Sequence, residues 1–282
     1  MRAGQTPHRS PFIGPLPPFV AQLPCADATR PMLDCMHTFY RALLAFHVVA
    51  STVGLAAMAL PLLAKKGARL HRVSGWLFTA GMAISAITGI LLAVAWMLFP
   101  VIFKPQSTPL QARLDDSFLA LIGLLTGNAL IQAIVAVRRK GSHALPGLLP
   151  RLSLYGLLAG SLGSVLLGVW FQVTLPLLFG LGSFALATRD LVFTLRPLPS
   201  PMAWWYQHMN AMGTACISAV TAFLVLGARR WVGSDVLGPN VWILWVAPSA
   251  ILVPLFHGWI FWYRRKFEAK TLRTRRMHEL PT

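Results

Sequence analysis

One long apolar stretch decides the fold class: Leu152–Leu195 reads LSLYGLLAGSLGSVLLGVWFQVTLPLLFGLGSFALATRDLVFTL. It holds 44 residues and has no charged side chain before Arg189. A helix that crosses a bilayer needs about 20 mostly apolar residues, so this stretch is long enough for two. Gln172, Thr174 and Pro176 interrupt it near its middle. We therefore expect two spans, with the chain turning at these residues.

The composition of the whole chain agrees with a membrane protein. Of 282 residues, 56% are hydrophobic and only 12% are charged, and the mean hydropathy is +0.62. Soluble proteins carry about a quarter charged residues, so a soluble globular domain is excluded, as are a disordered chain, a coiled coil and a collagen-like repeat. Only helices and closed barrels satisfy their backbone in lipid, and the long runs lack the alternation of a barrel strand. The sequence predicts an all-α, polytopic transmembrane helix bundle.

Seven apolar segments are expected to span the membrane. Basic or helix-breaking residues bound most of them, and the segments are 39–64, 73–99, 116–137, 152–171, 174–195, 207–228 and 240–263. This divides the chain into a Pro-rich tail over 1–38, a seven-helix domain over 39–263 and a basic tail over 264–282.

The basic residues predict the orientation. The net charge is +17, with 25 Lys and Arg residues against 8 Asp and Glu. If the N-terminus is outside, 17 of the basic residues fall on the cytoplasmic side and 8 on the other, which satisfies the positive-inside rule. We therefore expect an extracytoplasmic N-terminus, a cytoplasmic C-terminus and a place in a bacterial inner membrane. The charge is then explained by lipid headgroups, and no nucleic-acid partner is expected.

Small residues recur at every fourth position of the fourth span. Gly156, Gly160, Ser164 and Gly168 therefore line one face, and small residues let membrane helices approach closely. We expect the closest helix contact of the bundle along this face. Packing inside the bundle is the favoured reading, and a homodimer seam is the alternative.

The histidines are the main candidates for a functional site. His71 and His208 begin the second and sixth spans, and His257 lies near the inner end of the seventh, so the topology places all three in the cytoplasmic leaflet. His47 lies in the opposite half of the first span. Neutral imidazole is a common ligand of transition metals and haem iron. The cofactor-binding candidates are thus these four histidines, with haem b or a transition metal as the cofactor, and His71, His208 and Met212 as the metal ligands.

His47 is expected to need a partner of its own. Some 17 residues separate it from the inner end of its span, or roughly 25 Å of helix, so it cannot readily share a cofactor with His71. Asp115 or Asp116, at the outer start of the third span, is the carboxylate that could orient its ring. Inside the membrane, Asp190 next to Arg189 is the acidic exception, unless the fifth span ends at Thr188.

The cysteines carry little information. The three cysteines are too few for a disulfide scaffold, and no CxxC or HExxH motif occurs. Cys25 and Cys35 could form a disulfide in an oxidising compartment or stay reduced, and Cys216 is expected to be small buried packing.

Three stretches of the first two spans resemble a known family. They are His47 with the Val-Val-Ala that follows, Leu70–Trp76 (LHRVSGW) and Ser85–Gly89 (SAITG). They resemble the bacterial predicted membrane proteins grouped as domain of unknown function 2306, which have a histidine early in the first helix and a His-Arg-x-x-Gly motif opening the second.

The resemblance covers roughly residues 43–145. The run Arg138–His143 looks like a basic, glycine- and histidine-containing stretch of that family, but the Ala144–Pro146 that follows departs from its pattern. The function of the family is not established. The resemblance therefore implies an architecture and candidate histidines, and no reaction.

Two functions follow from these observations. The first is a redox protein that binds haem or a metal through the intramembrane histidines and works with a respiratory or other redox partner in the membrane. The second is a non-enzymatic transporter or assembly factor in which the histidines are structural. A nucleophile beside a base, which a hydrolase needs, does not stand out.

Overall fold

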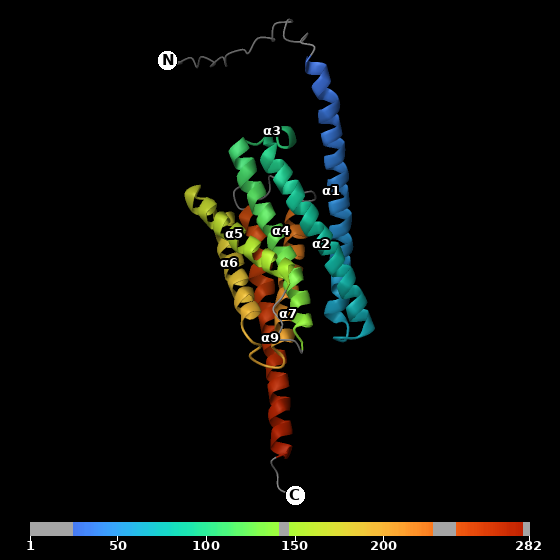
Figure 1. Ribbon diagram of the computed structural model, residues 1–282, viewed down its shortest axis with the longest axis vertical. Coiled ribbons are helices and arrows are strands. Elements are labelled where there is room, and N and C mark those ends of the chain that lie inside the picture. The colour runs from blue at the N-terminus through green and yellow to red at the C-terminus, as the bar shows by residue number, and fades with distance from the viewer. Residues whose placement is uncertain (1–24, 141–146, 228–240, 279–282) are drawn as a thin grey trace, which may run out of the picture. The chain divides into compact units, whose positions relative to one another are not determined.

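The computed structural model describes residues 25–140, 147–227 and 241–278, and regular structure in these residues is entirely helical (Figure 1). The elements in chain order are α1 (Cys25–Leu63), α2 (Arg69–Leu98), α3 (Pro100–Phe103), α4 (Pro109–Arg138), α5 (Leu148–Trp170), α6 (Thr174–Leu195), α7 (Ala203–Ala222), the π-helix η2 (Phe223–Gly227) and α9 (Val241–His278).

Seven of the described helices are long and apolar enough to cross a membrane, as predicted. They are Asp34–Leu63, Arg69–Leu98, Pro109–Arg138, Leu148–Trp170, Thr174–Leu195, Ala203–Gly227 and Trp242–Phe267. The third begins seven residues earlier than expected. Thr108 caps it by accepting a hydrogen bond from the Gln111 N–H, and Pro109 suits the first helical position.

The chain divides into two units, Met1–Leu43 and Leu44–Thr282, and α1 has residues in both. The helix begins at Cys25, inside the segment expected to be a tail. Cys35 is a free, exposed thiol. Ten residues of helix separate it from Cys25, about 15 Å along the axis, so the disulfide considered from the sequence does not form. At the other end of the chain, α9 continues to His278, well past the expected end at residue 263.

The expected turn between the fourth and fifth spans is confirmed. Gln172 has a φ of 56°, a left-handed conformation that reverses the chain between α5 and α6. The two helices then approach closely, because a Cβ built on Gly168 would lie 2.6 Å from the main-chain N of Leu177. The Ser164 hydroxyl donates to the Pro176 carbonyl at 2.9 Å.

The small residues of α5 do not all meet one neighbour. Gly168 and Ser164 face α6, whereas a Cβ on Gly160 would lie 2.9 Å from Cδ1 of Leu124 on α4. Gly156 has no heavy atom within 4 Å of the position that a Cβ would take. The small residues at every fourth position of α5 therefore contact two neighbouring helices, α4 and α6, rather than one.

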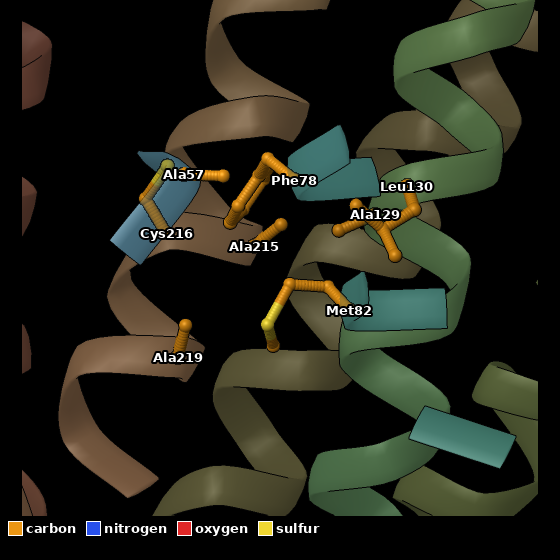
Figure 2. Close-up of a cluster of buried hydrophobic side chains, with 8 residues drawn as sticks. All are labelled: Ala57, Phe78, Met82, Ala129, Leu130, Ala215, Cys216 and Ala219. Carbon is orange, nitrogen blue, oxygen red and sulfur yellow. The ribbon is translucent and has the colours of Figure 1, made fainter. Parts of the chain in front are cut away.

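The main core lies where α1, α2, α4 and α7 meet. Figure 2 shows side chains from these four helices pointing toward one another: Ala57, Phe78, Met82, Ala129, Leu130, Ala215, Cys216 and Ala219. Outside it, large apolar side chains are exposed along the helices, for example Trp76, Leu166, Trp170 and Phe261. An outer surface of this kind is suited to lipid tails.

Candidate functional site

Two histidines at one end of the bundle are held in the same way. The Nδ1 atom of His71 lies 3.0 Å from the carbonyl oxygen of Pro61 on α1, and the Nδ1 atom of His208 lies 3.1 Å from the carbonyl oxygen of Ala133 on α4. A carbonyl only accepts, so Nδ1 carries the hydrogen in both rings and Nε2 carries the lone pair. Both rings are thereby oriented with a potential ligand nitrogen available.

The two rings lie at the same end of the bundle. His71 lies at the start of α2 and His208 at the start of α7, and both starts lie at the lower end of the helices in Figure 1. We call His71 and His208 the histidine pair.

A lysine lies beside the histidine pair. The Lys66 ammonium donates to the carbonyls of Pro61 and Leu62, each at 2.8 Å, and lies 4.9 Å from the centre of the Trp259 ring. The Pro61 carbonyl is also the partner of His71 Nδ1, so the ammonium and this ring are adjacent. Burial lowers the pKa of Lys66, against an opposing influence of Cys216.

Two sulfur side chains follow His208 on α7. Met212 and Cys216 come four and eight residues later, which places them on the same helix face, and both pack in or against the main core. Among the residues that the structure describes, no group of three or more His, Cys, Asp or Glu could hold a metal. An ion at the pair would therefore rest on two imidazoles, with Met212 as the available thioether.

The other predicted histidines make different contacts. His257 is exposed and bonds through Nδ1 to the Val253 carbonyl of its own helix at 2.9 Å. The Nδ1 atom of His47 lies 2.9 Å from the hydroxyl of Thr88, which is 17 residues after His71 on α2, or about 25 Å along the helix. His47 thus lies far from the pair, as expected.

The predicted carboxylate partner of His47 is wrong. Asp116 forms an ion pair with Lys104, and Asp115 accepts from Gln111 at 3.0 Å. Because the Thr88 hydroxyl donates to the Ile84 carbonyl at 2.7 Å, it accepts the hydrogen of His47 Nδ1. A hydroxyl of the neighbouring helix therefore orients this ring. His143, the third histidine of the family resemblance, lies outside the described residues.

A second polar site surrounds Asp190, whose partners on other helices were not predicted from the sequence. Its carboxylate is buried in α6 and accepts hydrogen bonds from three helices: Gln207 of α7 at 2.7 Å, Asn128 of α4 at 3.3 Å and Arg189 of α6 itself at 2.9 and 3.2 Å. Since α6 continues to Leu195, Asp190 lies inside the helix and pairs with the adjacent arginine.

The amides extend this site along α4. The Oδ1 atom of Asn128 accepts from the Ser153 hydroxyl at 3.0 Å and from the Gln132 amide at 3.4 Å. We call Asn128, Gln132, Arg189, Asp190 and Gln207 the Asp190 centre. Asn128 and Gln132 stand four residues apart within an apolar span, and this pattern in the sequence was the available signal.

No family model, curated protein or solved structure matches the chain. The functional argument therefore rests on the geometry of the histidine pair and of the Asp190 centre.

Proposed function

We propose that this chain is a multi-pass membrane protein that binds a transition-metal ion at the histidine pair and uses it in a redox role with a partner in the membrane. One observation carries the proposal. Each Nδ1–H of the pair is held by a main-chain carbonyl of a different helix, at 3.0 and 3.1 Å. In metal-ligating histidines, the N–H of the second ring nitrogen characteristically donates a hydrogen bond in this way, which fixes the ring and raises its basicity.

A metal ion suits this site better than haem b. The space between α2, α4 and α7 next to the pair is filled by Phe78, Met82 and their neighbours in the main core, and Phe78 is 1% exposed. A macrocycle would require these helices to separate, whereas an ion needs only two Nε2 atoms and a third ligand. Imidazole and the thioether of Met212 together favour copper.

The orientation is part of the proposal. The bias of basic residues supports an extracytoplasmic N-terminus and a cytoplasmic C-terminus, which places the histidine pair at the cytoplasmic side of a bacterial inner membrane. A reporter that is active only in the cytoplasm, fused after Thr282, should give signal. Signal from an N-terminal fusion alone would reverse the orientation.

The metal itself is tested on the purified protein. Elemental analysis and a visible spectrum of the full chain in detergent should show copper, or another transition metal, in about equimolar amount and no Soret band. His71→Ala and His208→Ala should each lose the metal. His257→Ala is the matched control and should keep it, because His257 is exposed and bonds only within α9.

Two outcomes would contradict this function. A Soret band that disappears in His71→Ala and His208→Ala would replace the ion by haem. Metal-free wild-type protein that takes up no added copper, with the fold intact, would reject the site altogether.

A transporter is the second candidate, and the Asp190 centre favours it. Ionisable residues inside membrane helices are rare and commonly mark the path of an ion or solute. The centre draws its side chains from three helices, as binding sites inside bundles do.

A further inference from the structure

The Asp190 carboxylate and the Gln132 side-chain carbonyl differ in their hydrogen bonding. The carboxylate accepts hydrogen bonds from Arg189, Gln207 and Asn128. The Oε1 atom of Gln132 is buried and has no hydrogen-bond partner in the described residues, although Gln132 itself is 0% exposed. A buried acceptor without a donor costs free energy comparable to a lost hydrogen bond.

The positive charge of the centre is more exposed than its negative charge. Asp190 is enclosed by α4, α6 and α7, with 4% of its side chain exposed, whereas 35% of the Arg189 side chain is exposed. An arginine near a helix end can extend toward the membrane surface while its stem stays on the helix. The guanidinium can therefore leave Asp190, but the carboxylate cannot follow it.

Departure of Arg189 would leave a buried carboxylate that needs another cation. Isolated charges inside a protein are strongly unfavourable, so the carboxylate would attract one. Beyond the Asn128 amide that donates to Asp190, the next oxygens along α4 are the Asn128 carbonyl, which accepts from Gln132, and the unpartnered Gln132 carbonyl. Hard cations prefer oxygen ligands of this kind, and an ammonium ion would donate hydrogen bonds to the same atoms.

We infer that the Asp190 centre binds a small monovalent cation, which replaces the Arg189 guanidinium on Asp190 and brings Gln132 Oε1 into its ligand shell. When no cation is bound, the Arg189 guanidinium neutralises the Asp190 carboxylate. This binding is independent of the histidine pair, because no member of the Asp190 centre is a metal-ligand candidate there.

Thermal unfolding of the purified full chain tests the inference. Melting temperatures are measured in sodium chloride, ammonium chloride and N-methyl-D-glucamine chloride at equal ionic strength. A ligand that binds only the folded state raises the melting temperature in proportion to the logarithm of its concentration. We expect sodium or ammonium, but not the bulky cation, to raise the melting temperature with this logarithmic dependence, and its onset gives the apparent dissociation constant of the cation. Sodium alone indicates coordination by oxygens, and ammonium alone indicates recognition of its N–H donors.

Four variants give the inference its specificity. Asp190→Asn should abolish the cation-dependent rise. Gln132→Leu should raise the apparent dissociation constant about tenfold, the effect of one lost hydrogen bond to a charged group. Arg189→Gln should lower this constant, because the competing internal cation is gone. Asp115→Asn, an exposed carboxylate on α4, is the matched control and should behave as wild type.

The Arg189→Gln result separates binding from a purely structural ion pair. If Arg189 only stabilised the fold, Arg189→Gln would melt lower in all three salts alike. Equal melting temperatures in the three salts for both wild type and Arg189→Gln would overturn the inference, as would an unchanged cation effect in Gln132→Leu. These two variants decide the question even if Asp190→Asn fails to fold.

Discussion

His208 on α7 donates its Nδ1 hydrogen to the main-chain carbonyl of Ala133 on α4, across 3.1 Å. The preceding residue of α7, Gln207, donates in a different direction, to Asp190 of α6 at 2.7 Å. Adjacent residues of a helix point about 100° apart, so this one turn of α7 serves both the histidine pair and the Asp190 centre. The two sites are neighbours that share no ligand.

The first prediction concerns the structural part of the His208 contact. His208→Ala should lower the free energy of unfolding by about 1 kcal/mol, since one hydrogen bond between α4 and α7 is lost. The measurement is thermal unfolding in detergent with a chelator present, so that metal binding does not contribute. His257→Ala removes only an exposed contact within α9 and should stay within about 0.5 kcal/mol of wild type. An equal loss in both variants would mean that the interhelical bond contributes nothing.

The second prediction concerns the close approach of α5 and α6. Gly168→Ala should destabilise the protein by about 1–3 kcal/mol, because the new Cβ would meet main-chain atoms of Leu177, which cannot move aside as a side chain can. Gly163→Ala on the same helix is the control. No heavy atom lies within 4 Å of its added Cβ, so it should be neutral or gain up to about 1 kcal/mol of helix propensity. Equal melting temperatures for the two variants would show that α6 is not packed on Gly168.

These glycines also show how far the sequence predicts the fold. Length and hydropathy predicted the seven long helices, because crossing a bilayer requires one continuous apolar segment per span. The spacing of the small residues predicted a shared face on α5. It could not predict that Gly160 meets α4 while Gly168 meets α6, since spacing within one helix carries no information about its neighbours.

The sites were less predictable for the same reason. His71 and His208 were predicted as ligands because imidazole binds metals and because the topology places both at one side of the membrane. The structure has both rings at one end of the bundle. Asp190 was noticed, but its partners Asn128 and Gln207 lie 62 and 17 residues away in the sequence. His47 was assigned Asp115 or Asp116 because both lie at the outer start of the third span. In the structure, Asp116 pairs with Lys104, and the hydroxyl of Thr88 is the partner of the histidine.

The third prediction concerns the ion pair of Lys104 and Asp116. Asp116 is 0% exposed, and its Oδ2 atom has no partner among the described residues, so Lys104 is its compensating charge. Lys104→Met should cost about 3–5 kcal/mol, because it leaves a buried carboxylate unpaired. The double variant Lys104→Met with Asp116→Leu should recover most of that loss. Chemical denaturation of the single and double variants measures both values, and a double variant no more stable than Lys104→Met would show that the carboxylate is not the source of the cost.

The last prediction concerns the pH dependence that Lys66 gives to stability. Burial lowers the pKa of Lys66 in the folded protein. In the pH range between this lowered value and the ordinary lysine value of about 10.4, the unfolded chain holds the proton and the folded protein has lost it. The unfolded state then binds more protons, so the free energy of unfolding should rise with pH across this range.

Lys66→Met should remove that part of the slope, although it also removes the bonds to Pro61 and Leu62 and so lowers the absolute stability. Lys65→Met, one residue earlier and exposed, should keep the slope. Unfolding measured from pH 7 to 10 in detergent compares the three proteins, and the same slope in wild type and Lys66→Met would show that the ammonium is as well solvated in the fold as in the unfolded chain.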